Sequence, residues 1–556
     1  MVINFDDLSP EQVISFESEI ESVIEDYNRI SSQLLSSVNE NGIELLFSNI
    51  TSRNENHSDF LFLLKCLKFI SKQSLKEGDT VIVSHKSLYR SLKVSPTGFK
   101  VVYRSKASIP KFRSRFYRIK EYLLTFKKYI SFYLSRSNER KERFVASTNT
   151  ILVDSFLHEN SIKEKRYIDR YYCNMLDGVG AANNIFYLLL YLPVPTKHDT
   201  QIIDNGTKVN IIYPFDLLKL QDYLYALRFP FKKYKFNKID YCGYDISAII
   251  KECCFSGSEY FMLAPLYYRF LQRAKEAGAD IKHVVDWYEN QSYDRALYKG
   301  MNDFYPHSSI YAFFGYITDY RLSPHVVPTR SEYDAGVAPL IIYTCNRWLR
   351  RIFEEKSNYA DCRVMSSFRA GAIWKLERKK AEEGPFKLLV PLSSITGEVV
   401  FKIGCLKSYL QNTRRELTVL LKPHPDISKE FVNSLVGESC KIEIVSGNIY
   451  DFLTDIDALV ATNSSVLYEA LALGIPVLSL FDNKGFFNCV KPDIVSDDMW
   501  LDISSPEDFD RGIDLFSNKG RNYYNKLGKE LRKDFFEPVS QEKILELLTL
   551  NKKETT

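Results

Sequence analysis

The carboxyl-terminal part of the chain alternates between short apolar runs and longer amphipathic segments. Each run of apolar and β-branched residues is followed by a stretch long enough for a helix, which is typical of βα units around a mainly parallel sheet. The predicted strands are Lys387–Val390, Thr418–Leu421, Lys441–Val445, Asp457–Ala461 and Val477–Leu480. We therefore expect a doubly wound, Rossmann-like domain whose ligands bind beyond the carboxyl ends of its strands.

The amino-terminal part shows the same alternation less regularly. Ser9-Pro10-Glu11-Gln12 reads as an N-cap, a first-turn proline and a capping-box Gln, and it predicts a helix to about Val38. One long helical stretch is predicted from about Asp245 to Glu276, and further helices around Asp294–Met301 and from Asn346. The predicted strands are Ile43–Phe47, Thr80–Ser84, Lys100–Tyr103, Thr150–Val153, Asn184–Leu192, His283–Tyr288, Ile310–Gly315, Leu340–Thr344 and Cys362–Ser366.

A charged, helix-prone segment that ends in Gly384-Pro385 interrupts this pattern and predicts the domain boundary. We expect an α/β fold with two Rossmann-like domains in series. The N-terminal domain with helical additions spans 1–370, the linker 371–385 and the C-terminal domain 386–556, with terminal helices that can pack back onto the N-terminal domain.

Composition narrows the class of protein. With 556 residues, 45% hydrophobic and 26% charged, the chain can form full-sized cores, which excludes a disordered or collagen-like protein. Its ten Cys form no CxxC pair, which fits reduced thiols in a cytoplasmic protein without a structural metal. No signal peptide is visible at the N-terminus. The longest apolar run, Ile185–Pro195, is about half the roughly 20 residues that a membrane-spanning helix needs.

The net charge of +4 conceals one basic segment. Residues 104–143 contain 13 Lys/Arg and three Asp/Glu, a net charge of +10, so the remaining residues sum to −6. Aromatic residues are interleaved with these cations, which favours an interfacial helix on an anionic membrane surface. A solvated helix with its aromatic residues in the core remains the alternative. Nucleic acid is a less favoured partner, because no nucleic-acid-binding module accompanies the segment.

Polar residues after three predicted strands of the C-terminal domain indicate a phosphate site. The prolines of Lys422-Pro423-His424-Pro425 stiffen the backbone that presents Lys422 and His424. Thr462-Asn463-Ser464-Ser465 precedes a helix, where hydroxyls and free backbone N–H groups favour an anion. Ser394 and Thr396 precede another helix, and Glu469 lies where it could accept from ribose hydroxyls. An ordinary turn, plain N-caps and a surface Glu are the alternatives.

These motifs resemble the nucleotide-binding half of GT-B glycosyltransferases that build bacterial surface polysaccharides. The His-Pro motif followed by a Ser-Ser pair is similar to that of bacterial sialyltransferases, capsule Kdo transferases and teichoic-acid polymerases. The resemblance implies two Rossmann-like domains facing across a cleft, with His424, Ser464 and Ser465 as phosphate ligands and Glu469 as a ribose ligand. Residues 280–490 carry it. The chain departs from the family where Gly315-Tyr316-Ile317-Thr318 stands in place of Gly-Tyr-Gln-His, and the acidic base motif of sialyltransferases is not evident.

The middle of the chain supplies the candidate catalytic residues. Trp287-Tyr288-Glu289-Asn290-Gln291 resembles a signature of surface-carbohydrate biosynthesis proteins, and Glu289 follows a predicted strand. Sugar transfer needs a carboxylate or His that deprotonates the acceptor hydroxyl or, in a retaining double displacement, attacks the anomeric carbon. We predict Glu289 in this role with Asp286 in reserve, and Arg369 and Gln291 as substrate ligands. A structural role for Glu289 and an interdomain salt bridge for Arg369 remain alternatives.

The sequence thus predicts a glycosyltransferase acting on a bacterial surface glycan such as lipopolysaccharide O-antigen or capsule. A CMP-activated acidic sugar, CMP-Kdo or a CMP-nonulosonate, is the first donor hypothesis. UDP-hexose transfer, CDP-glycerol-type polyol-phosphate transfer, UDP-sugar 2-epimerisation and an inactive GT-B scaffold are the alternatives. No DxD cluster stands in a convincing loop, so we expect no metal and no cofactor beyond the nucleotide sugar, and a glycan or lipid-linked acceptor.

Overall fold

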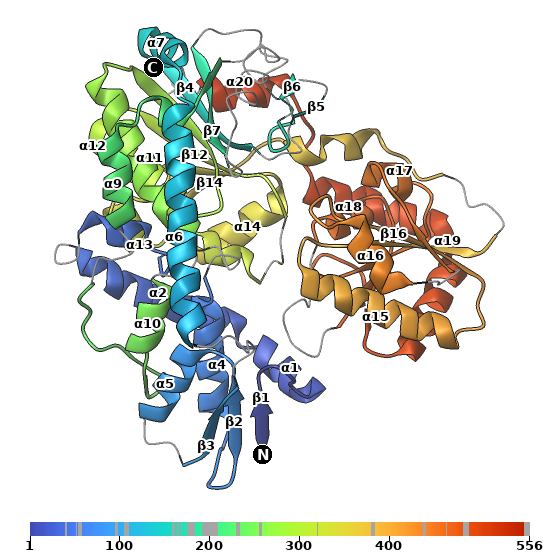
Figure 1. The fold of residues 1–556 in the computed structure, drawn as a ribbon. Coiled ribbons are helices and arrows are strands. Elements are labelled where there is room, and N and C mark those ends of the chain that lie inside the picture. Colours follow the sequence, from blue (N-terminus) through green and yellow to red (C-terminus); the bar gives the residue numbers. More distant parts are fainter. Residues whose placement is uncertain are drawn as a thin grey trace.

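The strands of the chain pair into two large parallel sheets in the computed structural model (Figure 1). The structure describes residues 1–556 except 39–41, 52, 54–57, 95–97, 105–110, 158–161, 164–165, 168, 174, 176–183, 192–209, 229–233, 255–257, 318, 320, 380–383, 438–440, 463, 482–488 and 550–556. Thr318, Asn463, Cys440 and part of the predicted linker therefore lie outside the described residues.

The N-terminal Rossmann-like domain is built on a seven-stranded sheet, counted over the described residues, in the order β14-β13-β12-β11-β4-β7-β8. Its strands are continuous apolar runs because helices cover both faces, and Val284 and Val285 of β11 are fully buried. The strands are β4 (Thr150–Leu157), β7 (Ile185–Tyr191), β8 (Asn210–Ile212), β11 (Ile281–Trp287), β12 (Ser309–Phe314), β13 (Ile341–Thr344) and β14 (Asp361–Val364). The short pair β5 (Ile162–Lys163) and β6 (Arg166–Tyr167) lies beside them.

The helices of this domain include the long α6, which stands at the front of Figure 1. They are α6 (Lys111–Leu134), α7 (Asn138–Ala146), α9 (Leu220–Arg228), α11 (Ser258–Glu276), α12 (Ser292–Phe304), α13 (Arg330–Asp334) and α14 (Arg347–Lys356), with the 3-10 turns η4 (Pro214–Asp216), η6 (Ser323–Val326) and η7 (Phe368–Lys375). Over the described residues, no helix combines the length and apolar character that a membrane crossing requires.

The C-terminal Rossmann-like domain has the sheet order β17-β16-β15-β18-β19-β20. The chain order reverses between β15 and β18, and the crevice beyond the carboxyl ends of such a pair is where doubly wound sheets bind ligands. Its strands are β15 (Phe386–Pro391), β16 (Leu417–Lys422), β17 (Ile442–Ile444), β18 (Ala458–Ala461), β19 (Val477–Leu480) and β20 (Trp500–Ile503). Its helices are α15 (Thr396–Asn412), α16 (Lys429–Val436), α17 (Ile449–Leu453), α18 (Val466–Ala472) and α19 (Pro506–Phe535), kinked at Gly520, with the turn η8 (Asp497–Met499).

A smaller N-terminal unit has its own core. It contains the three-stranded parallel sheet β1 (Val2–Asn4), β2 (Thr80–Val83) and β3 (Lys100–Tyr103), with α1 (Pro10–Glu17), α2 (Ile20–Ser36), α4 (Phe60–Lys72) and α5 (Lys86–Val94). Later residues return to complete it as the hairpin β9 (Asp240–Tyr241) and β10 (Tyr244–Asp245) and as α10 (Ser247–Cys253). Phe481, which follows β19, packs against this core from the C-terminal domain.

Three details differ from the sequence-based prediction. The strand predicted for Ile43–Phe47 is wrong, because this run forms a buried 3-10 turn, η1, after Gly42 at a φ of 86°. A short apolar run does not by itself distinguish a strand from a buried turn. The predicted helix to Val38 is divided into α1 and α2, and the stretch Asp245–Glu276 holds α10 and α11 as separate helices.

The chain passes twice between the two Rossmann-like domains at neighbouring points. In the first crossing, Arg378 donates to the backbone oxygens of Gly474 and Ile456, both at 2.6 Å. In the second, the chain leaves α19 and forms α20 (Gln541–Thr549), which lies on the N-terminal domain (Figure 1). There the His283 ring Nε2 is 2.9 Å from the backbone oxygen of Leu547. The two crossings are in contact, because the backbone N–H of Ser367, near the first, donates to the backbone oxygen of Glu537 in the second.

Candidate functional site

The crevice between β15 and β18 is organised by a buried ion pair. Lys402 and Glu398 of α15 are fully buried, with Nζ 2.7 Å from the carboxylate, and Lys402 also donates to the Pro391 oxygen at the end of β15. The Thr462 hydroxyl, just after β18, donates to the same Glu398 carboxylate. This arrangement fixes the loop after β15 relative to the loop after β18.

The hydroxyl side chains predicted for phosphate binding lie on these two loops. Ser394 and Thr396 are exposed at the start of α15, and Ser464 and Ser465 are partly exposed before α18. Ser465 is the N-cap residue of α18, and its side chain makes no capping hydrogen bond to the helix. The structure therefore brings these four predicted residues to the edge of the sheet where the chain order reverses.

His424 extends the same edge from the end of β16. Its Nδ1 accepts the backbone N–H of Asp426 at 3.2 Å, so the neutral ring carries its proton on Nε2. Burial, opposed by Asp426 and reinforced by Arg170, Arg369 and Lys422, lowers the pKa of His424. The neighbouring Lys422 ammonium donates to the Pro423 oxygen at 3.1 Å, and burial lowers its pKa. His424 can thus act as a neutral donor at neutral pH.

Glu469 of the C-terminal domain lies within electrostatic range of Arg369 of the N-terminal domain. Burial raises the pKa of the Glu469 carboxyl to about 7, although Arg369 and a hydrogen bond with Tyr450 act in the opposite direction. The turn η7, which contains Arg369, packs against α18, which contains Glu469. The predicted ribose ligand and the predicted substrate arginine therefore meet at the contact between the two domains.

Glu289 lies just after β11 and is partly exposed. Its carboxylate accepts the Trp287 indole N–H at 3.2 Å and the Gln291 side-chain amide. Asp294 holds the loop by accepting the backbone N–H groups of Glu289 at 3.1 Å and Gln291 at 2.8 Å. Donors on both carboxylate oxygens fix the orientation of the Glu289 side chain.

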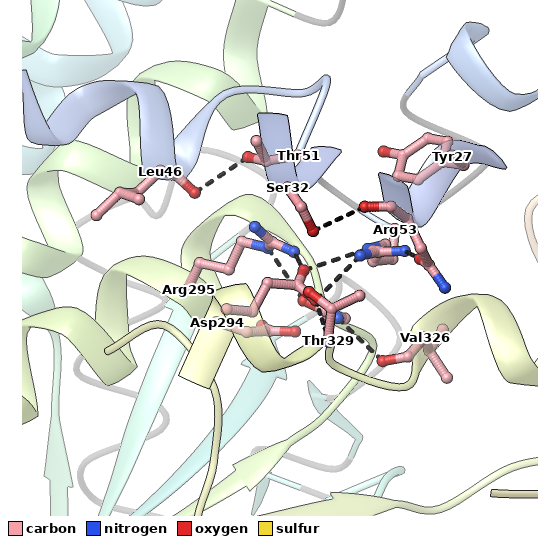
Figure 2. A network of polar contacts seen from close by, with 12 residues as sticks. Tyr27, Ser32, Leu46, Thr51, Arg53, Asp294, Arg295, Val326 and Thr329 are labelled. Atoms are coloured by element: carbon pink, nitrogen blue, oxygen red, sulfur yellow. Dashed lines mark hydrogen bonds and ion pairs between the residues drawn. The ribbon is translucent and has the colours of Figure 1, made fainter. Parts of the chain in front are cut away.

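A buried network supports the loop that carries Glu289 (Figure 2). Asn290 has a left-handed backbone, with φ at 53°, and its side chain accepts from the Arg295 Nε at 3.0 Å. The Arg53 backbone N–H donates to the Asn290 oxygen at 3.0 Å. Arg53 and Arg295 both pair with the Glu332 carboxylate, and all three side chains are essentially inaccessible to solvent. Residues from the N-terminal unit, α12 and α13 thereby fix one conformation of this loop.

Two predicted residues do not face solvent. Asp286 is fully buried, where the Tyr298 hydroxyl donates to it, and burial raises its pKa. A substrate does not reach this carboxyl, so Glu289 alone retains the predicted catalytic role. Gln291 is only 4% exposed and its amide is used by Glu289, so it orients Glu289 rather than contacting a substrate.

Sequence reasoning did not single out Arg170 and Tyr171, which follow β6. The Tyr171 ring packs edge-on against Trp287, with centroids 4.7 Å apart. Burial, reinforced by the Glu289 charge and opposed by Arg369 and Arg170, raises the pKa of Tyr171. Tyr171 therefore lies among the side chains of the candidate site. The segment that carries Arg170 and Tyr171 shows no sequence motif, and its position beside Trp287 depends on tertiary contacts such as the pairing of β4 with β11.

Within the part of the chain that the structure describes, no group of three His, Cys, Asp or Glu side chains has a metal-binding arrangement. The candidate site instead combines a carboxylate, arginines, a neutral imidazole and hydroxyls. Such a set suits proton abstraction next to an anionic leaving group.

Two Rossmann-like domains, with the ligand-binding edge of the second facing the first, define the GT-B fold. No family model and no curated protein matches the chain. The apo form of the lipopolysaccharide outer core galactosyltransferase WaaB is similar with a TM-score of 0.39 and 11% identity, covering 72% of this chain and 100% of that chain. UDP-GlcNAc 2-epimerase from Neisseria meningitidis bound to UDP-GlcNAc is similar with a TM-score of 0.42 and 11% identity, covering 73% of this chain and 100% of that chain. The wall teichoic acid polymerase TagF is similar with a TM-score of 0.41 and 12% identity, covering 81% of this chain and 99% of that chain.

Proposed function

We propose that the chain is a metal-independent glycosyltransferase that transfers a sugar from a nucleotide donor to a bacterial surface glycan. The observation that carries the proposal is that Glu289 follows β11 of one Rossmann-like domain, while the phosphate-type side chains lie at the ligand-binding edge of the other, which packs against η7 of the first. The charges of Glu289 and Arg369 both act on the Tyr171 phenol, and the charge of Arg369 also acts on His424 of the C-terminal domain.

The chemistry of transfer assigns a role to each group. Glu289 takes the proton of the acceptor hydroxyl as that oxygen bonds to the anomeric carbon of the donor. The bond from the anomeric carbon to the phosphate oxygen breaks at the same time, and the nucleotide leaves with the bonding electrons. His424, through its Nε2–H, and the hydroxyls of Ser464 and Ser465 stabilise the charge that develops on the leaving phosphate.

A CMP-activated acidic sugar is the first donor hypothesis, supported by the pairing of His424 with Ser464 and Ser465. The ribose hydroxyls would lie against Glu469. Its position one turn into α18 places it beside the serines, and Tyr450 and Arg369 restrict its orientation. A UDP-hexose or CDP-glycerol donor is the alternative, and the choice of nucleotide in the assay decides among them.

Nucleotide binding tests the proposal directly. The full chain is melted in the presence of CMP, CDP, UDP or GDP, where a ligand at 100 times its Kd adds about 2.7 kcal/mol of stability. We expect stabilisation by cytidine nucleotides that is lost in His424→Ala. The control is His307→Ala, an exposed histidine of the N-terminal domain. Stabilisation by UDP or GDP alone would exclude the cytidine donor, and no response to any nucleotide would exclude nucleotide-dependent transfer.

A complementation assay distinguishes an active enzyme from an inactive scaffold. Strains that lack the protein are complemented with the wild-type gene, with Glu289→Ala or with His424→Ala, and the surface glycan is analysed. We expect both variants to fail. Full complementation by both variants would support the scaffold alternative and contradict the enzymatic role.

We also propose that α6 places the enzyme on an anionic membrane surface, close to a lipid-linked acceptor. Tyr129 and Phe132 anchor one face of α6 in the core, whereas Leu123, Ile130 and Leu134 are 58%, 43% and 72% exposed on the other. The exposed residues also include Lys120 and Lys127. An apolar stripe flanked by cations suits the interface of an anionic bilayer. The side chains of Lys111, Arg113, Arg115 and Arg118 lie outside the described residues.

Vesicle binding tests this placement. Sedimentation with phosphatidylglycerol vesicles is compared for the wild type and for a Leu123→Glu/Ile130→Glu double variant. Val400→Glu is the control, because Val400 is a similarly exposed apolar residue on α15, at 47%. We expect only the double variant to lose binding. Equal binding by both variants, or no binding of the wild type, would contradict the membrane placement.

A further inference from the structure

Two arginines of the N-terminal Rossmann-like domain lie at the candidate site without a protein partner. Arg170 follows β6 and Arg369 lies in η7. Neither guanidinium makes a hydrogen bond or an ion pair with any residue that the structure describes. Of the nearby carboxylates, Glu289 accepts the Trp287 indole N–H, and Glu469 is hydrogen-bonded with Tyr450.

The backbone that carries Arg170 is fixed from inside the domain. Asp169 is 2% exposed and accepts the backbone N–H groups of Tyr171 at 2.9 Å and Tyr172 at 3.1 Å. The Tyr187 hydroxyl on β7 donates to the other Asp169 oxygen at 2.7 Å. Asp169 therefore closes a turn over Arg170 and ties it to the sheet. Among the described residues, no hydrogen bond or ion pair from the Arg170 side chain holds this turn, so the guanidinium is available to a ligand.

Arg369 is brought to the same place by aromatic packing. The ring of Phe368, the preceding residue, lies 5.3 Å from Phe313 and 6.3 Å from Tyr172, measured between centroids. Tyr172 belongs to the turn that Asp169 closes. The two arginines are thus carried by segments that pack on one another, and η7 also packs against α18 of the C-terminal domain.

The surroundings favour an anion from outside the protein. The charges of both arginines contribute to the lowered pKa of His424, so both lie within electrostatic range of that ring, and η7 packs against α18 of the same domain. Lys422 adds a third cation. Unpaired guanidinium groups held on ordered backbone recognise phosphate or carboxylate through paired, charge-assisted hydrogen bonds.

We propose that Arg170 and Arg369 form a two-arginine clamp that binds an oxyanion of the ligand opposite His424. The oxyanion is a phosphate of the nucleotide or the carboxylate of an acidic sugar. The clamp deepens the proposed function, on which it rests for the identity of the ligand. Because the arginines and His424 belong to different domains, the anion bridges the two.

Calorimetric titration of the full chain tests the clamp. The probes are inorganic pyrophosphate, CMP, CDP, cytidine and N-acetylneuraminate, and the variants are Arg170→Ala, Arg170→Lys and Arg369→Ala. Arg414→Ala is the control, because Arg414 is an exposed arginine at the amino end of β16, the opposite edge of the sheet. Loss of one charge-assisted contact predicts a fall in affinity of about 10- to 100-fold. Lysine at 170 should restore part of it, because it keeps the charge but not the two-pronged contact.

The pattern of losses identifies the source of the oxyanion. Weaker binding of pyrophosphate and CDP, with cytidine binding unchanged, assigns the clamp to phosphate. Weaker binding of N-acetylneuraminate alone assigns it to the carboxylate. Affinities within twofold of the wild type in both alanine variants, or no binding of any anion by the wild type, would overturn the clamp. Pyrophosphate binding without any nucleotide binding would instead retain the clamp and contradict the proposed function.

Discussion

Neutralising Glu332 tests whether the buried arginine network holds the Glu289 loop. Glu332 is the shared partner of Arg53 and Arg295, and the exposed fractions of the three side chains are 0–1%. Burial, followed by the Arg53 charge, already lowers the pKa of Arg295 to about 9. Glu332→Gln leaves two buried guanidinium groups without a counter-charge. Removing one member of a buried pair costs about 3–5 kcal/mol, and sharing of the carboxylate favours the upper end of that range.

The assay is urea unfolding followed by tryptophan fluorescence in a Trp500→Phe background, where the remaining tryptophans all lie within residues 1–375. With an m-value of about 3 kcal/mol/M, the expected loss moves the midpoint down by about 1–1.7 M. Glu354→Gln is the control, because Glu354 and Arg350 form an exposed pair on α14. Such a pair contributes about 0.5 kcal/mol or less. Equal midpoints for the Glu332 and Glu354 variants would refute the reasoning.

Three further predictions concern the chemistry of the site. Glu289→Gln should lower kcat by about 10²- to 10⁴-fold, because a general base contributes that much, and should leave nucleotide affinity unchanged. Transfer assays measure kcat and calorimetry measures the affinity. An unchanged kcat would contradict the role of Glu289 as the base. Since the pKa of Glu469 is raised from about 4.5 to about 7, the folded state holds an extra proton between these pH values and stability should fall as pH rises through them. Glu469→Gln should abolish that slope in thermal melts from pH 4.5 to 8, and an unaltered slope would assign it to another group. Activity should survive dialysis against EDTA, and a loss that Mg²⁺ restores would contradict metal independence.

The sheet-edge residues of the C-terminal domain were predictable from sequence because their environment is local. His424 and Ser464 directly follow apolar runs, and in a parallel sheet the ends of such runs meet at one edge. The alternation of strands and helices was sufficient to place them. Which of Asp286 and Glu289 faces solvent was not predictable, because that depends on where β11 ends and on what packs around it.

Arg170 illustrates what the local pattern omits. The chain reaches β11 about 120 residues after β4, yet the two strands pair side by side, and this pairing brings the Asp169 turn next to Trp287. No short-range signal encodes a pairing at that separation. The strand prediction for Ile43–Phe47 was wrong for the opposite reason. The apolar run satisfies a strand pattern, and only tertiary packing selects the 3-10 turn.

The double passage of the chain between the Rossmann-like domains limits how they can move. A single linker would allow the domains to swivel in all directions, whereas two crossings joined near Ser367 and Glu537 leave mainly rotation about one axis. Arg170 and His424 belong to different domains, so a rotation about that axis changes the distance between them. The geometry of the chain path thereby converts domain rotation into a change in the width of the anion site.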